Sequence, residues 1–100
     1  MNLPHRVRIT HKITYEVVWI DQFLDGPDTR GECRFDSRQI VICRNQTPRW
    51  ILRTFIHEVL HAMEHELGIE MKHDSIYKLE EAVERICRLN RWLSAGGVGR

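Results

Sequence analysis

The segment His57-Glu58-Val59-Leu60-His61 has the residue types and the spacing that could do chemistry. On a helix, residues four positions apart lie one above the other, so two imidazoles about 6 Å apart along the axis can converge on one metal ion. Glu58 is rotated by about 100° from His57 and borders the place where a metal-bound water would sit. We therefore predict that His57 and His61 bind zinc and that Glu58 acts as general base.

A catalytic zinc ion usually has three protein ligands and one open position, so a third ligand is needed. His65 continues the series but lies about 12 Å along a straight helix from His57, which places it outside the site. His73 or Asp74 could fold back after Gly68 and supply the ligand. These two residues are one group of candidates.

A second group of candidates lies further along the chain, at Glu80, Glu81 and Glu84. At 100° per residue, Glu80 falls at the edge of the expected inner face of that helix, Glu84 further round and Glu81 on the far side. Glu80 is the best third ligand on this basis. Tyr77 and His73 are the nearest residues that could stabilise a developing oxyanion.

The motif lies within a strongly marked helix. Thr47 before Pro48 predicts the helix start, because a hydroxyl can accept an orphan amide bond and proline suits the first position. Gly68 predicts the helix end. Between them, apolar residues recur at three- and four-residue spacing: Leu52, Phe55, Ile56, Val59, Leu60, Met63 and Leu67.

A second helix is expected from near Asp74 or Ser75 to about Leu93. Its inner face is predicted from an apolar stripe of Ile76, Leu79, Val83, Ile86, Asn90 and Leu93. Arg85, Arg88 and Arg91 recur along the same segment, but glutamates lie between them. A solvated helix face is therefore favoured over a nucleic-acid interface.

The first half of the chain is typical of strands. Between Arg6 and Ile20 the apolar residues stand at odd positions, which predicts one half-buried face and two strands joined near His11 and Lys12, or one long bent strand. The stretches 32–35 and 39–43 flank a short polar connection that suits a hairpin. These patterns predict a small antiparallel sheet.

The composition sets the broad class of the protein. A chain of 100 residues with 42% hydrophobic residues has material for one small domain, expected over residues 1–95 with a flexible tail at 96–100. The formal net charge of +1 gives no bias toward nucleic acid. No apolar run approaches the roughly 18 residues of a membrane span, and three widely spaced cysteines suit reduced thiols, so we expect a soluble cytoplasmic protein.

Two stretches of the sequence resemble small gluzincin-type zinc metallopeptidases: Phe-Ile-His-Glu-Val-Leu-His-Ala at 55–62 and Leu-Glu-Glu-Ala-Val-Glu-Arg-Ile at 79–86. The likeness is greatest to the minimal versions from phages and bacteria, related in pattern to the ImmA/IrrE type. It implies that Glu80 is the third ligand and that Glu84 is a supporting carboxylate. Val83 and Cys87 stand where that pattern has alanine, which keeps Glu81 as an alternative. SprT-like proteins are also similar, and their pattern would favour His73.

The resemblance also implies how a substrate binds. In zincins the substrate pairs with the strand at the sheet edge above the active-site helix. The candidate for that strand is the segment 39–43, which consists of Gln39, Ile40, Val41, Ile42 and Cys43.

The sequence thus predicts an α+β, zincin-like fold in which three or four antiparallel strands pack on the active-site helix and a second helix. The predicted function is a metallopeptidase with one Zn²⁺ and a peptide or protein substrate, in a bacterial or phage-infected cell. The alternative is a degenerate zincin that binds a protein partner without cutting it.

Overall fold

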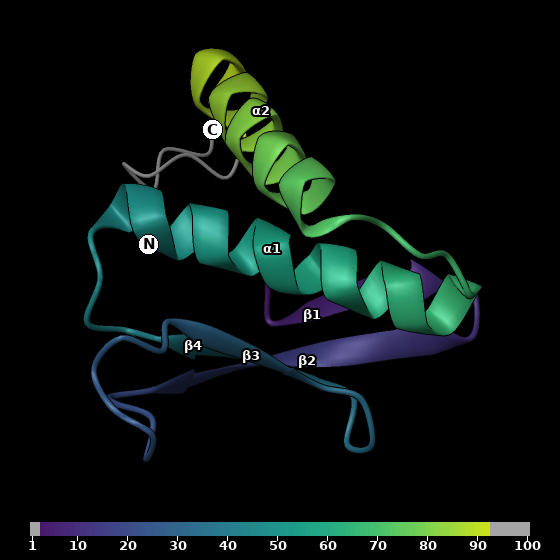
Figure 1. Ribbon diagram of the computed structural model, residues 1–100, viewed down its shortest axis with the longest axis horizontal. Coiled ribbons are helices and arrows are strands. Elements are labelled where there is room, and N and C mark those ends of the chain that lie inside the picture. The colour runs from purple at the N-terminus through teal and green to yellow at the C-terminus, as the bar shows by residue number, and fades with distance from the viewer. Residues whose placement is uncertain (1–2, 93–100) are drawn as a thin grey trace.

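The computed structural model describes residues 3–92, which form four strands and two helices. In chain order these are β1 (Arg6–Thr10), β2 (Ile13–Ile20), β3 (Gly31–Arg34), β4 (Gln39–Cys43), α1 (Pro48–Leu67) and α2 (His73–Asn90). Figure 1 shows α1 lying across the sheet, with α2 on the side of α1 away from the strands. The α+β class is as predicted. α2 ends at Asn90, before the expected end near Leu93, because Arg91 adopts a left-handed conformation and caps the helix. The expected tail 96–100 lies outside the described residues.

The sheet is mixed, whereas an antiparallel sheet was predicted. Its strand order is β1-β2-β4-β3, with antiparallel β1–β2 and β3–β4 pairs as expected and a parallel pair between β2 and β4. The segment 21–30 carries the chain past the position of β4 to the sheet edge, where β3 forms. The turn after β3 then brings β4 back between β3 and β2, parallel to β2.

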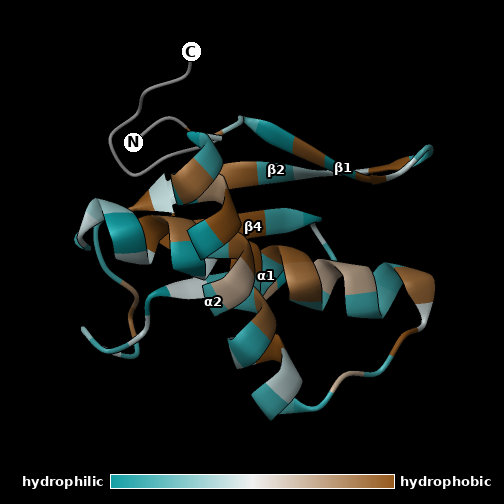
Figure 2. Cartoon of the chain, turned by 90° about the horizontal axis from the view of Figure 1, so that it is seen from above, coloured by the Kyte–Doolittle hydropathy of each residue, from teal (hydrophilic) through white to brown (hydrophobic). Residues whose placement is uncertain are grey.

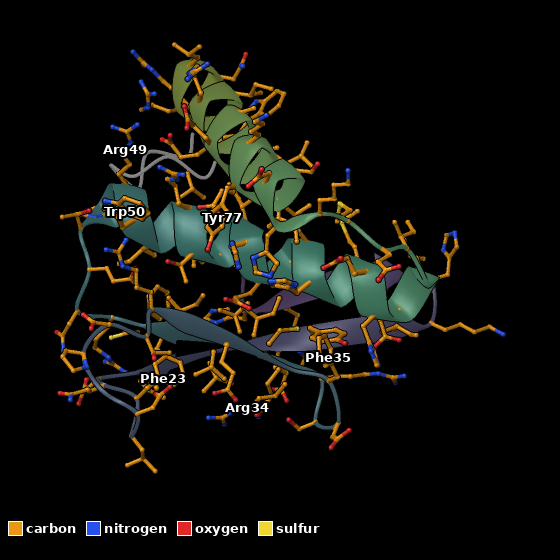
Figure 3. The ribbon with its side chains drawn as sticks, in the orientation of Figure 1. Phe23, Arg34, Phe35, Arg49, Trp50 and Tyr77 are labelled. Carbon is orange, nitrogen blue, oxygen red and sulfur yellow. The ribbon has the colours of Figure 1, made fainter. Side chains whose placement is uncertain are left out.

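β4 is an interior strand, so the prediction that the sequence 39–43 forms a substrate-binding edge is wrong. Its backbone pairs with β2 on one side and β3 on the other. Ile40 and Ile42 belong to the core under α1, while Val41 and Cys43 pack with Phe23 on the opposite face (Figure 3). A continuous apolar run indicates a strand buried on both faces. The edge strand that contacts α1 beside β4 is β3.

α1 begins and ends where the sequence predicts. The Thr47 side chain accepts a hydrogen bond from the Trp50 amide at 3.3 Å, Pro48 occupies the first turn, and Gly68 closes the helix with a φ of 65°. The apolar face of α1 packs on the sheet, and its other side contacts α2. α1 is therefore the middle layer, with the motif near its centre.

α2 packs chiefly against α1 (Figure 2), and its buried face agrees with the predicted stripe only in part, at Ile76 and Val83. Leu79 and Ile86 are 41% and 49% exposed, whereas Glu80 and Glu84 are 3% and 0% exposed. The reason is that α1 turns basic side chains toward α2, so the glutamates gain partners at this contact.

Within residues 3–92, neither helix is long and apolar enough to cross a membrane.

Candidate metal centre

The two histidines of the motif direct one nitrogen each toward a common point. Nε2 of His57 lies 3.0 Å from Nε2 of His61, and the rings meet edge to face with centroids 4.7 Å apart. Both side chains are largely buried, with 19% and 26% of their surface exposed. Zinc–nitrogen bonds of about 2.0–2.1 Å from both atoms can meet at one position across this separation.

A carboxylate holds the other nitrogen of each ring. Nδ1 of His57 lies 2.6 Å from Oε1 of Glu80, and Nδ1 of His61 lies 2.9 Å from Oε1 of Glu64. A carboxylate beside Nδ1 favours the proton on that nitrogen and leaves Nε2 with a lone pair. Two such lone pairs 3.0 Å apart repel unless a proton or a cation lies between them. The donor chemistry therefore suits a divalent cation.

Glu64 is a part of the site that the sequence analysis missed. Its second carboxylate oxygen accepts a hydrogen bond from the Met71 amide at 2.8 Å, and this bond lowers the pKa of Glu64. The carboxylate thus connects His61 to the segment between the helices. Its place three residues after His61 on the same helix was the signal that could have identified it.

Glu80 is beside the site, on the opposite side of the His57 ring from Nε2. It is buried, and Oε2 accepts a hydrogen bond from Nε of Arg53 at 3.2 Å. Glu80, the predicted third ligand, thus contacts His57 at Nδ1 and orients the ring. Within residues 3–92, no group of three or more His, Cys, Asp or Glu side chains is arranged to hold a metal ion. The alternative Glu81 lies elsewhere, exposed and paired with Arg85 at 3.2 Å.

Glu58 lines a pocket of about 410 Å³ that opens beside His57. Its side chain is buried, and no hydrogen bond to it is present among the described residues. Burial, and then the negative charges of Glu32 and Glu80, raises the pKa of Glu58 to about 7. A carboxylate with such a pKa can accept and release a proton near neutral pH, as a general base must.

Gly31 at the start of β3 allows the sheet edge to approach Glu58. A Cβ atom at Gly31 would clash with Cγ2 of Thr54 and lie 3.2 Å from Oε2 of Glu58. Only glycine fits this contact without a shift of β3 or α1. The role of this residue depends on the approach of two distant segments, so the sequence pattern gave no sign of it.

Tyr77 and His73, the predicted oxyanion candidates, lie at the rim of the site. The Tyr77 ring is 5.4 Å from the His57 ring, and the His73 ring is 6.1 Å from the His61 ring, centroid to centroid. Tyr77 is half-exposed and lines the pocket. Both side chains can therefore reach toward a molecule bound at the histidines.

Two other predicted residues lie away from the histidines. Glu84, expected as a supporting carboxylate, is paired with Arg88 at 3.1 Å and with Arg49 at 3.6 Å. Its Oε1 atom has no hydrogen-bond partner among residues 3–92. His65 stacks on Phe35 with a centroid distance of 4.2 Å, as its position one turn beyond His61 suggested.

The sequence matches no protein-family model, and comparisons with curated proteins and with solved structures find no match. The resemblance to gluzincins therefore rests on the residues of α1 and α2 and stays a prediction. What the geometry provides is a pair of oriented imidazoles, a carboxylate in a pocket beside them and two polar rings at the rim.

Proposed function

We propose that this protein is a zinc-dependent metallopeptidase. The observation that carries the proposal is the pair of Nε2 atoms 3.0 Å apart, each on a ring whose Nδ1 meets a carboxylate. His57 and His61 would hold the ion through their Nε2 atoms, and Glu80 would orient the His57 ring through Nδ1. A bound zinc ion supplies Lewis-acid polarisation of a carbonyl and a more acidic water.

Glu58 does the proton transfer in this proposal. Its carboxylate faces the pocket without a competing hydrogen bond among the described residues, and in the metal-free chain burial raises its pKa to about 7. It takes the proton of the attacking water and returns it to the leaving amine. The Tyr77 hydroxyl and the His73 ring are the donors nearest to the carbonyl oxygen of a bound peptide.

The edge strand supports a peptide as the substrate. Among residues 3–92, β3 pairs with β4 alone, so its other edge has backbone groups that can add a further strand. The same strand begins at Gly31, which borders Glu58. A peptide paired with β3 would therefore run past the proposed base.

A digest of a peptide library tests the proposal. The zinc-loaded chain should cut peptides, a chelator should stop cleavage, and Glu58→Gln should lower kcat by about 10²–10⁴-fold while the zinc content stays the same. Glutamine keeps the shape of the side chain but cannot accept the proton. Cleavage by Glu58→Gln at the unmodified rate would contradict the role of Glu58.

One observation favours the alternative, a zinc-binding module that recognises a protein without cutting it. The outward side of α2 and its C-terminal end expose large apolar side chains: Leu79, Ile86, Leu89 and Trp92. Four large exposed apolar side chains within residues 79–92 favour an interaction surface on this part of the molecule. Bound zinc without cleavage of any library peptide would support this module and contradict the peptidase.

A further inference from the structure

The pocket at the metal centre extends along α1 to an aromatic and basic cluster. Trp50 lies two turns before His57, and both residues line the same pocket with Arg30. The Arg30 guanidinium carbon lies 4.1 Å from the Trp50 ring centroid, and that of Arg53 lies 4.6 Å from the same centroid. In Figure 3, Trp50 is labelled near the start of α1, and Tyr77 of α2 is labelled closer to the middle of α1.

The two arginines on Trp50 differ in what they bind. Arg53 is paired with Glu80 at 3.2 Å, whereas no carboxylate of residues 3–92 lies within 4.0 Å of the Arg30 side-chain nitrogens. A guanidinium stacked on an aromatic ring keeps its N–H edge available for a carboxylate, which it can bind through two parallel hydrogen bonds. Arg30 is therefore the cation of this cluster that can take a ligand.

The backbone of Arg30 is held firmly although its side chain is exposed. Its carbonyl oxygen accepts hydrogen bonds from the Cys43 amide at 2.9 Å and from Nε2 of Gln46 at 3.1 Å. The Gln46 side chain in turn accepts a hydrogen bond from Thr54 at 2.9 Å. These contacts and the stacking position Arg30 before any ligand binds, which reduces the entropy cost of binding.

The acidic residues that line the pocket do not occupy Arg30. Glu80 is paired with Arg53, and Glu58, which borders Gly31, makes no ion pair with Arg30. Asp28 is exposed, and no ion pair joins it to another described residue. An anionic group can therefore approach Arg30 from the open side of the pocket.

Arg30 lies where the C-terminal part of a bound peptide would be. Residue 50 precedes residue 57 by seven positions, which corresponds to about 10 Å along α1 and to about three residues of extended peptide. Antiparallel pairing is the more stable arrangement for a strand added to β3. In that arrangement, the C-terminal part of the peptide lies over the start of β3, immediately after Arg30 in the chain.

We propose that Arg30, stacked on Trp50, binds a carboxylate of the substrate within about three residues on the C-terminal side of the cut bond. That carboxylate is an acidic side chain or the C-terminus of the peptide. The proposal rests on the proposed peptidase function for its cleavage readout, while the carboxylate contact itself requires only the pocket.

Paired peptides test the proposal with the zinc-loaded full chain. A peptide that the library digest shows to be cut is prepared with Glu or Gln at each of the three positions after the cut bond, and with a free or amidated C-terminus. We expect at least one carboxylate peptide to have a kcat/KM about tenfold above its neutral partner, a difference of about 1.4 kcal/mol. The Glu/Gln pairs identify a side chain, and the acid/amide pair identifies the terminus. Equal values in all pairs would overturn the proposal.

Two matched variants assign the preference to Arg30. Arg30→Gln should reduce the ratio for the preferred pair to about one. Arg8→Gln removes the same charge from an exposed residue on β1, at the opposite edge of the sheet, and should keep the ratio. A ratio that survives Arg30→Gln, or that falls equally in both variants, would overturn the role of Arg30.

A binding measurement separates this proposal from the peptidase function. The same peptide pairs are titrated calorimetrically into the Glu58→Gln chain, in which peptides are not consumed. If the unmodified chain cuts no peptide, the peptidase proposal fails, and the pairs are built on a library peptide that the chain binds. About tenfold tighter binding of the carboxylate peptide, abolished by Arg30→Gln, would then still uphold the carboxylate site. Equal binding of both peptides would overturn it.

Discussion

Glu80 and Glu84 lie one turn apart on the buried face of α2, yet their surroundings differ. Glu80 meets the imidazole of His57 and the guanidinium of Arg53. Glu84 meets two guanidinium groups, on α1 and on its own helix. Burial and residue type are the same, so the residue facing each glutamate from α1 decides whether it joins the metal centre or connects the two helices.

The facing residues on α1 follow a regular spacing of four: Arg49, Arg53 and His57. Such residues share one helix face, so α1 presents two arginines and then a histidine to α2. An arginine has only donors and cannot bind a metal ion, whereas an imidazole held at Nδ1 has Nε2 available. The candidate site therefore begins where this row changes from arginine to histidine.

The matched substitutions Glu80→Gln and Glu84→Gln test that comparison most strongly. We expect Glu80→Gln to weaken zinc binding by about 10–100-fold, the loss typical of removing a carboxylate that orients a metal-binding histidine. Glu84→Gln should leave zinc affinity unchanged. Competition with a chromogenic chelator measures both affinities.

A loss far above 100-fold in Glu80→Gln would show that Glu80 binds zinc itself and does not only orient His57. Equal zinc affinities in the two variants would contradict the distinction between the two glutamates.

The pH dependence of the free energy of unfolding of the zinc-free protein distinguishes Glu58 from the ion-paired Glu80 and Glu84. The pKa of Glu58 is raised from 4.5 to about 7, so its effect on stability is most favourable below pH 4.5 and is lost as the pH rises through 7. Glu58→Gln lacks this loss and should be more stable than the unmodified chain at pH 8, by at most about 3 kcal/mol. Urea unfolding of both chains with chelator, at pH 4.5 and pH 8, measures the difference, and a gap that does not widen with pH would contradict the raised pKa.

Gly31→Ala disturbs the site from the sheet side. The added Cβ clashes with Thr54, so we expect a loss of about 1–3 kcal/mol in the free energy of unfolding. Thr54→Ser removes the methyl group that the Cβ would meet and keeps the hydroxyl that bonds Gln46. The double variant should therefore recover part of the loss in thermal or urea unfolding. No recovery would show that the clash with Thr54 is not the cause.

The smallest effect is expected for the stability of Glu84→Gln. The variant loses its ion pairs, but both arginine partners are about half-exposed and stay solvated. We expect a loss of about 1–2 kcal/mol in the free energy of unfolding, measured in urea at neutral pH. A loss above about 3 kcal/mol would mean that the pairs of Glu84 behave as fully buried salt bridges.

The sequence predicted local structure better than the packing of distant segments. α1 follows from Thr47, Pro48 and Gly68, and the histidine pair follows from helical spacing. We predicted β4 as an edge strand, but residues 40–43 lack the polar alternation of such a strand, and this feature could have indicated its interior position.

The remaining features depend on contacts between segments far apart in the chain. The buried face of α2 was misread because glutamates count as polar until their arginine and histidine partners on α1 are known. Gly31 and Arg30 gain their roles only when β3 meets α1 and Trp50. Spacing along one segment cannot reveal such contacts.

X-ray absorption at the zinc edge of the zinc-loaded chain tests directly whether His57 and His61 bind zinc. We expect one zinc ion per chain, with two imidazole nitrogens at about 2.0–2.1 Å and oxygen ligands at about 2.0–2.2 Å. No sulfur is expected, because no cysteine is among the described residues that line the pocket beside His57. A chain that retains no zinc, or a sulfur ligand at about 2.3 Å, would contradict the proposed site.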